Sequence, residues 1–399
     1  MSAMKRLFQL MAEKKASDIF LSVGAPINIK INGNAVPVNQ TVMTAEAVQT
    51  LLYEVLNERQ IKEYEEELEL NTAFALEGVG AFRISAFRQK NSPAVVVRFI
   101  PGSIPPLDSL GVPEVLKEVI MAKRGLILMV GATGSGKSTS LSSMIDYRNE
   151  RKAGHILTLE DPVEFIFQSK KSIVNQREVG TDTKSFNVAL KNALRQAPDI
   201  ILIGEIRDKE TMGMALAYAQ SGHLALATLH ANNSYHAMNR IINFYPLENR
   251  PSLLLDLSAA LQSIISQRLI RTKSGGRMAA VEVLLNTRHI SELIEKGEIN
   301  EIKDALEKSM SPGSQTFEQA LFKLFMDGKI SQEEAMANAD SATNMLWLIN
   351  QATAGDITGQ PPAAAPATPA KEEEKKESIL SPAGGGNASF SSFKIDGVG

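Results

Sequence analysis

Apolar positions in the first hundred residues switch between helical and strand-like spacing. Leu7 and Met11 share one side of a short helix, and isoleucines at every second position from Ile27 to Ile31 favour a strand. The elements expected here are a helix (3–15), a strand (16–23), a hairpin (27–31 and 35–38) and two helices (48–56 and 61–68). The acidic run 63–69 is interpreted as the solvated face of the last of these helices.

Residues 81–100 predict a second hairpin, closed by the loop 88–93. In a symmetric hairpin the numbers of paired residues sum to 181, which places Arg83 directly beside Arg98. The opposite face is wholly apolar and consists of Phe82, Ile84, Ala86, Val95, Val97 and Phe99. Like charges across a strand pair are unfavourable unless an anionic group lies over them. The pattern therefore predicts an anion beside the two arginines, and a merely solvated pair is the alternative.

A run of five apolar residues, Leu126–Val130, leads into a glycine-rich loop and then into a helical pattern. A helix is expected before this run, at residues 115–120, and strands and helices alternate beyond it. The later elements are a strand (156–160), a helix (185–196), a strand (200–204), a helix (209–221) and a strand (224–229). This alternation predicts an α/β fold with a parallel sheet covered by helices.

The pattern changes near the C-terminal end. From Ser252 onward it predicts mostly helices, interrupted by one strand at residues 279–285. Capping boxes that open two late helices are expected at Thr316 with Gln319 and at Ser331 with Glu334. After about residue 355, alanine, proline, a Lys/Glu run and Ser/Gly stretches take over, which predicts a disordered tail.

Length and composition limit the class of protein. A chain of 399 residues with 44% hydrophobic residues is long enough for two ordinary domains. A net charge of −3 and a pI of about 6.1 provide no global reason to expect nucleic acid. The absence of cysteine excludes disulfides and thiolate zinc sites. No signal peptide is recognised and no run approaches the roughly 18 apolar residues of a membrane span, so a cytoplasmic protein is expected.

Proline and glycine gather at residues 101–106, which is the strongest signal for a domain boundary. We therefore expect a smaller N-terminal domain, a linker, a larger domain whose C-terminal part is helical, and a tail. Their predicted bounds are 1–100, 101–113, 114–354 and 355–399.

The glycine-rich loop has the spacing of a nucleoside triphosphate site, G-x-x-x-x-G-K-S. Its expected phosphate-binding residues are Gly131, Ala132, Thr133, Gly134, Ser135, Gly136, Lys137, Ser138 and Thr139. Glycines let backbone N–H groups curl around phosphate oxygens, and the helix N-terminus adds positive potential. Lys137 can reach the β- and γ-phosphates, while Ser138 can offer its hydroxyl to Mg²⁺. A glycine-rich turn without a ligand is the alternative.

Polar side chains follow three further apolar strands. Glu205 ends the strand at 200–204, where a carboxylate can hold a Mg²⁺-bound water. Acidic residues at 160–164 follow another strand, and a solvated turn is the alternative there. His223 and His230 flank the strand at 224–229, and a structural histidine is the alternative for each.

Residues 1–345 resemble the secretion-type hexameric ATPases that drive type IV pili, in particular the pilus retraction branch. The resemblance rests on four boxes that occur in order: Walker A (131–139), an Asp box (160–164), Walker B (200–205) and a His box (222–230). It implies a RecA-like P-loop ATPase domain preceded by a smaller PAS-like α/β domain. ATP and Mg²⁺ are the implied cofactors.

The resemblance also implies roles for individual residues. Glu164 would be the general base or water-positioning residue, Glu205 would hold Mg²⁺ through water, and His230 with His223 would sense the γ-phosphate. The family's N-terminal domain supplies arginines to the nucleotide, and Arg83 and Arg98 match those positions. Implied partners are a homo-hexamer, a paralogous retraction ATPase and an inner-membrane platform protein, with no nucleic acid. Membrane association would occur through partners only, at the cytoplasmic face of the inner membrane.

The chain departs from the family pattern at two places. Phe20 stands where histidine is common, and residues 289–295 lack both arginines of a segment that retraction motors carry. Together with the extended tail, this resembles the accessory paralogue of the main retraction motor, and it leaves ATP hydrolysis untouched. The alternatives are an assembly or type II secretion ATPase, which usually carries a tetracysteine zinc element, a nucleic-acid motor, and a scaffold that binds ATP without turnover.

Overall fold

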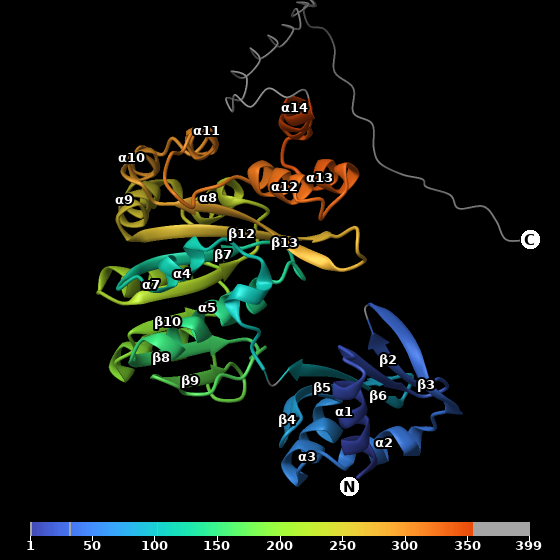
Figure 1. Cartoon of the computed structure of the whole chain (residues 1–399). Coiled ribbons are helices and arrows are strands. Elements are labelled where there is room, and N and C mark those ends of the chain that lie inside the picture. Colours follow the sequence, from blue (N-terminus) through green and yellow to red (C-terminus); the bar gives the residue numbers. More distant parts are fainter. Residues whose placement is uncertain (1, 32, 102, 354–399) are drawn as a thin grey trace, which may run out of the picture. The chain divides into compact units, whose positions relative to one another are not determined.

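Two β-sheets organise the computed structural model, which describes residues 2–31, 33–101 and 103–353 (Figure 1). The first sheet uses strands from residues 18–101 and the second uses strands from residues 125–285. The predicted tail, 355–399, lies outside the described residues, and the predicted domain bounds stay predictions. Within the described part of the chain, no helix combines the length and apolar character that a membrane crossing requires.

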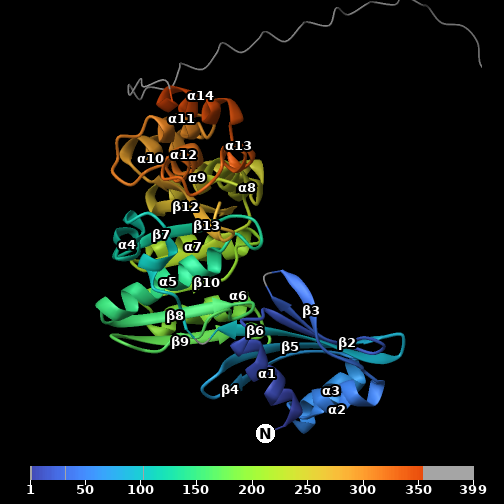
Figure 2. The same cartoon turned by 45° about the vertical axis from the view of Figure 1, so that its right-hand side comes forward.

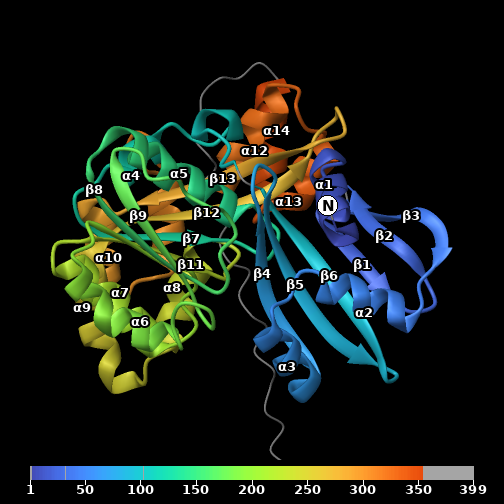
Figure 3. The ribbon, with the colours of Figure 1, turned by 90° about the horizontal axis from the view of Figure 1, so that it is seen from below.

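The first sheet has the strand order β3-β2-β1-β6-β5-β4, which can be followed in Figure 3, and all neighbouring strands are antiparallel. Its elements are α1 (Ala3–Glu13), β1 (Asp18–Ser22), β2 (Pro26–Ile31), β3 (Asn34–Val42), α2 (Ala45–Tyr53), α3 (Glu58–Glu67), β4 (Glu69–Leu76), β5 (Gly80–Gln89) and β6 (Ser92–Pro101). Helix α1 packs on this sheet through Phe8, whose ring stacks on Phe82 with centroids 4.1 Å apart. The elements expected from the sequence are therefore present.

The register of the β5–β6 hairpin is the predicted one. Arg83 pairs with Arg98, and Phe82 pairs with Phe99, so paired numbers sum to 181. The side chains of Phe82, Ile84 and Val97 are fully buried because their face packs against the helices. The acidic run on α3 is exposed apart from Tyr64, as expected for a solvated helix face.

The second sheet has the order β13-β12-β7-β11-β10-β8-β9, and all its pairs are parallel except β12 with β13. Its strands are β7 (Gly125–Val130), β8 (Gly154–Glu160), β9 (Ser172–Glu178), β10 (Ile200–Ile203), β11 (Leu224–Leu229), β12 (Leu261–Arg271) and β13 (Arg277–Leu285). The helices around it are α4 (Val115–Ile120), α5 (Lys137–Arg151), α6 (Phe186–Ala193), α7 (Lys209–Gln220), α8 (Ser234–Asn243) and α9 (Arg250–Ala260).

Helices cover both faces of this sheet, and β7 shows why its sequence is uniformly apolar. Leu126, Leu128 and Val130 join a core with α6–α9, whereas Ile127 and Met129 join a second core with α4 and α5. Successive side chains of a strand point to opposite faces, so a strand covered on both sides is apolar at every position. The predicted parallel sheet with helical cover is confirmed by this arrangement.

The prediction of mostly helical structure from Ser252 onward is wrong over β12. This strand lies between β7 and β13 and is buried along most of its length. Its sequence mixes polar and apolar residues, and the polar side chains of Ser263, Ser266 and Gln267 are buried, so it shows no strand-like polar–apolar alternation. Strand β9 was not predicted either, because its mixed residues at the sheet edge show no clear period.

The remaining helices gather on the β12–β13 side of the second sheet in Figures 1 and 2. They are α10 (Arg288–Lys296), α11 (Glu301–Glu307), α12 (Phe317–Met326), α13 (Gln332–Asn338) and α14 (Ala342–Thr353). Thr316 and Gln319 form the predicted capping box at α12. Ser331 caps α13 as predicted, but the Glu334 carboxylate accepts a hydrogen bond from Asn338 at 3.3 Å rather than from the cap.

Candidate functional site

The parallel strands bring four predicted segments to one edge of the second sheet. The glycine-rich loop follows β7, His230 follows β11, Glu205 lies just beyond β10, and the acidic segment 160–164 ends β8. Neighbouring parallel strands place their carboxyl ends at the same edge, which is where ligands bind in open α/β sheets. The second sheet therefore assembles these boxes from segments up to about a hundred residues apart in the chain.

The loop between β7 and α5 has the backbone that a phosphate cradle requires. Gly134 and Gly136 have φ values of 78° and 85°, in the left-handed region that favours glycine. Gly136 also precedes the first residue of α5, so the loop ends at a helix N-terminus. Backbone N–H groups at such a terminus have no partner within the helix and can bind an anion.

Lys137 lies at the centre of this loop. Its side chain is 9% exposed, and its ammonium donates hydrogen bonds to the carbonyl oxygens of Gly131 at 2.8 Å and Ala132 at 2.9 Å. Burial lowers the pKa of Lys137, and the nearby carboxylates of Glu205 and Glu164 act in the opposite direction. The strand order brings Lys137, Glu205 and the acidic segment to the same edge of the sheet. The sequence-predicted lysine and acids are thus brought together.

Glu205 is held by two basic side chains at the edge of the sheet. Its Oε2 accepts a hydrogen bond from Arg207 Nε at 2.6 Å, and its Oε1 lies 3.4 Å from His230 Nε2. Arg207 Nη1 also lies 3.4 Å from a carboxylate oxygen of Asp161. The hydrogen bond to Glu205 raises the pKa of Arg207, so the guanidinium stays charged. Arg207 is a site residue that the sequence reasoning missed.

The two glutamates of the acidic segment have different environments. Glu160 is buried and accepts hydrogen bonds from Thr158 at 2.7 Å and Gln176 at 3.2 Å. Burial raises the pKa of Glu160, although hydrogen bonds to its carboxylate, including one from the Glu164 backbone, oppose that effect. Glu164 itself is exposed. Glu160 therefore helps to fix the conformation of the segment, and Glu164 is the carboxylate presented to solvent.

Gln267 is a second residue that the sequence reasoning missed. It lies on β12, where its Nε2 donates to the carbonyl oxygen of Ser135 at 2.9 Å and its Oε1 accepts from Ser140 at 2.7 Å. A Cβ on Gly136 would lie 2.7 Å from Gln267 Nε2, and the φ of 85° at Gly136 favours glycine there. The sequence offered no clear signal for it, because Gln267 is one of several polar residues among residues 261–270.

The structure separates His223 from the phosphate-binding loop. His223 precedes β11, and its carbonyl accepts a hydrogen bond from Gly125 at the start of β7. Its ring lies beside Ser221 at 3.0 Å and against the ring of Tyr218. His223 and His230 therefore lie at opposite ends of β11, and only His230 is close to Glu205. Within one chain, His223 is not placed to sense a phosphate on the loop.

Arg83 and Arg98 have carboxylate neighbours from the chain itself. Arg83 donates to the carbonyl oxygen of Val163 at 3.1 Å, and burial lowers its pKa while Glu178 and Glu164 oppose that effect. Arg98 is 63% exposed in its side chain and forms an ion pair with Asp18 at 3.0 Å. A protein carboxylate, that of Asp18, thus lies beside Arg98, and the role of the two arginines toward a nucleotide stays a prediction.

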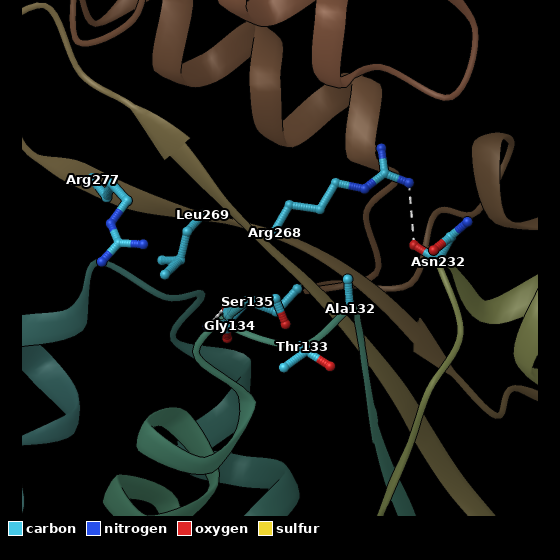
Figure 4. Close-up of a pocket in the computed structure, with 9 residues that line it drawn as sticks. Ala132, Thr133, Gly134, Ser135, Asn232, Arg268, Leu269 and Arg277 are labelled. Atoms are coloured by element: carbon cyan, nitrogen blue, oxygen red, sulfur yellow. Dashed lines mark hydrogen bonds between the residues drawn. The ribbon is translucent and has the colours of Figure 1, made fainter. Parts of the chain in front are cut away.

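A cavity of about 280 Å³ opens beside the loop, between residues 132–135 and strands β12 and β13. Figure 4 shows Arg268 reaching toward Asn232 on one side, with Leu269 and Arg277 on the other. Arg268 donates to the carbonyl oxygen of Asn232 at 3.1 Å and pairs with Asp340. Arg268 therefore connects the segment after His230 to Asp340 in the helical C-terminal part.

The residues of this site fit a triphosphate and a hard cation. The Ser135 hydroxyl is buried and, within the described residues, has no hydrogen-bond partner, which leaves a polar group available at the loop. Ser138 and Glu205 offer the oxygen donors that Mg²⁺ prefers, and Mg²⁺ is usually held by one or two such groups plus substrate phosphates. These donors, Lys137 and the helix N-terminus suit a nucleoside triphosphate.

Comparisons with known proteins agree with this geometry. A model of the Type II/IV secretion system protein family matches residues 2–337. The Type IV pilus ATPase PilU of Pseudomonas aeruginosa is 48% identical over 353 residues, covering 88% of this chain and 92% of that protein. The Type IV pilus retractation ATPase PilT of the same organism is 42% identical over 338 residues, covering 85% and 98%.

A solved structure extends the likeness to three dimensions. The crystal structure of the pilus retraction motor PilT with bound ADP matches with a TM-score of 0.80 and 40% identity, covering 86% of this chain and 98% of that one. The predicted α/β fold class is confirmed, as is the resemblance to type IV pilus ATPases. The chain therefore belongs to the Type II/IV secretion system protein family, and it is an ATPase.

Proposed function

We propose that the chain is a Mg²⁺-dependent hexameric motor that powers type IV pilus retraction beside a principal retraction ATPase. The observation that carries the proposal is the 48% identity to PilU over nearly the whole of both chains. The proposed partners are five further copies of the chain, the paralogous ATPase and an inner-membrane platform protein, with no nucleic acid. The proposed location is the cytoplasmic face of the inner membrane, reached through those partners.

The site supports a division of labour among its charged groups. In this structure the Lys137 ammonium donates hydrogen bonds to two loop carbonyls. It can turn from them to the β- and γ-phosphates and neutralise the charge that develops during phosphoryl transfer. Glu164 can orient the attacking water and accept its proton. His230 contacts Glu205 and so lies where it can respond to the γ-phosphate. Ser138 and Glu205 would hold Mg²⁺, which supplies positive charge to the phosphate oxygens.

The type II secretion alternative is less well supported by the same comparisons. The type II secretion proteins HxcR of Pseudomonas aeruginosa and E of Aeromonas hydrophila match only 43% and 40% of this chain. Those matches also cover only 32% and 30% of the relatives' own lengths. The PilU and PilT matches, in contrast, extend over nearly the full relatives, which favours the pilus retraction role.

Cells that lack this chain are expected to assemble surface pili and to lose part of their retraction, because assembly would use a different ATPase. The measurement compares surface pilin recovered by shearing with the speed and stall force of single-pilus retraction, with and without the chain. The Lys137→Ala variant supplied in place of the wild type is the control for a requirement for ATP hydrolysis. Loss of surface pilin with normal retraction of the few remaining pili would contradict the retraction role and favour assembly.

Replacing Glu164 with glutamine is expected to lower ATP turnover by about 10²–10⁴-fold, the usual contribution of a positioned base. Nucleotide binding should survive because Glu164 is exposed outside the loop 131–139 and Lys137 is still present to reach the phosphates. Phosphate release and the Kd of a non-hydrolysable ATP analogue are measured on the same sample. Glu248→Gln, another exposed glutamate far along the chain, is the control. A collapse of analogue affinity in Glu164→Gln would show that Glu164 is structural.

A further inference from the structure

Arg207 links two of the acidic segments at the edge of the second sheet. It lies in the turn between β10 and α7, where its Nε donates to Glu205 at 2.6 Å. Its Nη1 lies 3.4 Å from the carboxylate of Asp161, which follows β8. One guanidinium therefore contacts carboxylates from the ends of two neighbouring parallel strands.

Both carboxylate oxygens of Glu205 are engaged by this arrangement. Oε2 faces Arg207 and Oε1 faces His230, and the Glu205 side chain is only 18% exposed. Lys137 lies near enough to influence Glu205 electrostatically, but its hydrogen bonds go to loop carbonyls. Among the described residues, Arg207 is thus the permanently charged group that neutralises Glu205 by direct contact.

The contact is not explained by a need for stability. The Arg207 side chain is 55% exposed, and ion pairs of this kind contribute about 0–1 kcal/mol to folding. The same carboxylate is the one that the proposed mechanism assigns to Mg²⁺. A Mg²⁺-bound water and Arg207 Nε would both donate to the Glu205 carboxylate, so the two cations would compete for the same negative charge.

We propose that Arg207 is a positioning residue that occupies Glu205 in the nucleotide-free chain and releases it when Mg²⁺–ATP binds. This inference rests on the Mg²⁺ dependence of the proposed function. Before ATP arrives, the guanidinium of Arg207 neutralises the carboxylates of Glu205 and Asp161. When Mg²⁺–ATP binds, the metal takes over that charge at Glu205. It also means that Mg²⁺ binds in competition with Arg207, so the cation–nucleotide complex is required to displace the guanidinium.

The competition predicts a specific change in metal linkage. The quantity of interest is the ratio of the Kd of a non-hydrolysable ATP analogue in EDTA to its Kd in Mg²⁺. In the full-length chain, Arg207→Gln should increase this ratio by about three- to tenfold, because one charge-assisted hydrogen bond no longer opposes the metal. Affinity for the analogue in EDTA should stay within about twofold of the wild type. Arg207→Lys keeps the positive charge and should restore most of the wild-type ratio.

The experiment measures the analogue's Kd by calorimetry with saturating MgCl₂ and with EDTA, for the wild type, both Arg207 variants and Arg195→Gln. Arg195 is exposed on the same domain and has no contact with the acidic segments in the described structure, so its ratio should match the wild type. A second readout is the shift in melting temperature caused by MgCl₂ alone, which should be larger in Arg207→Gln.

The outcomes separate this inference from the proposed function. A wild type that binds the analogue equally well with Mg²⁺ and with EDTA would contradict the proposed Mg²⁺ site and this inference together. A wild type that depends on Mg²⁺, with an unchanged ratio in Arg207→Gln, would overturn this inference alone. A lower ratio in Arg207→Gln would show that Arg207 supports the metal site, and that result overturns the inference as well.

Discussion

Replacing Lys137 with alanine is expected to abolish ATP hydrolysis and to weaken ATP binding sharply. The β- and γ-phosphates lose the cation that neutralises them, and no other lysine or arginine contacts the loop carbonyls that Lys137 now occupies, within the described residues. The fold should survive because Lys137 contributes no apolar packing to either core of the second sheet. Phosphate release and nucleotide Kd are measured on full-length protein.

The matched control is Lys184→Ala, which removes an exposed lysine outside the loop. Its turnover and nucleotide affinity should equal those of the wild type. Melting curves of both variants establish whether a loss of activity reflects the loop or the fold. Wild-type turnover in Lys137→Ala would contradict the assignment of the whole nucleotide site.

Removing Arg83 and Arg98 together is expected to cut turnover by roughly 10³–10⁵-fold, the contribution of an arginine that stabilises phosphoryl transfer. The proposed reason is that at least one of them acts on the γ-phosphate of a neighbouring subunit when the ring closes. Nucleotide affinity should fall much less than turnover. The fold should persist because both side chains lie on the face of the hairpin opposite its apolar residues.

Mixing two inactive variants tests whether the arginines act between subunits. One variant is Arg83→Ala/Arg98→Ala and the other is Lys137→Ala, combined in equal amounts. Mixed rings can place an intact phosphate-binding loop beside a neighbour with intact arginines, so some turnover should return. No recovery in demonstrated mixed oligomers would contradict action in trans. It would favour the contacts that Arg83 makes within its own chain, to Val163 and the nearby carboxylates.

Local patterns carried most of the successful predictions. The strand, glycine loop and helix at 126–139 are continuous in sequence, so periodicity and spacing suffice to locate them. The β5–β6 register was also predictable, because a short symmetric hairpin leaves one pairing that puts every apolar residue on one face. The order of the boxes along the chain then placed Glu205 and His230 at the same edge of a parallel sheet.

Contacts between segments that are far apart in the chain could not be predicted from the sequence. Gln267 reaches the loop only because β12 pairs with β7, and 132 residues separate it from Ser135. Arg207 stood next to a recognised box, but its bond to Glu205 depends on how the turn after β10 folds back. His223 was predicted to act with His230 because the two are close in the sequence. Strand β11 lies between them, so they are at opposite ends of that strand.

We propose that this chain hydrolyses ATP at the loop 131–139 as part of a ring. The most direct test measures steady-state phosphate release by purified wild type and Lys137→Ala at saturating Mg²⁺–ATP, with molar mass determined by light scattering on the same samples. We expect turnover by the wild type at a mass well above that of one 43.3 kDa chain, and no turnover by Lys137→Ala at the same mass. Equal turnover in the two samples, or none from a wild type of demonstrated ring mass, would contradict it.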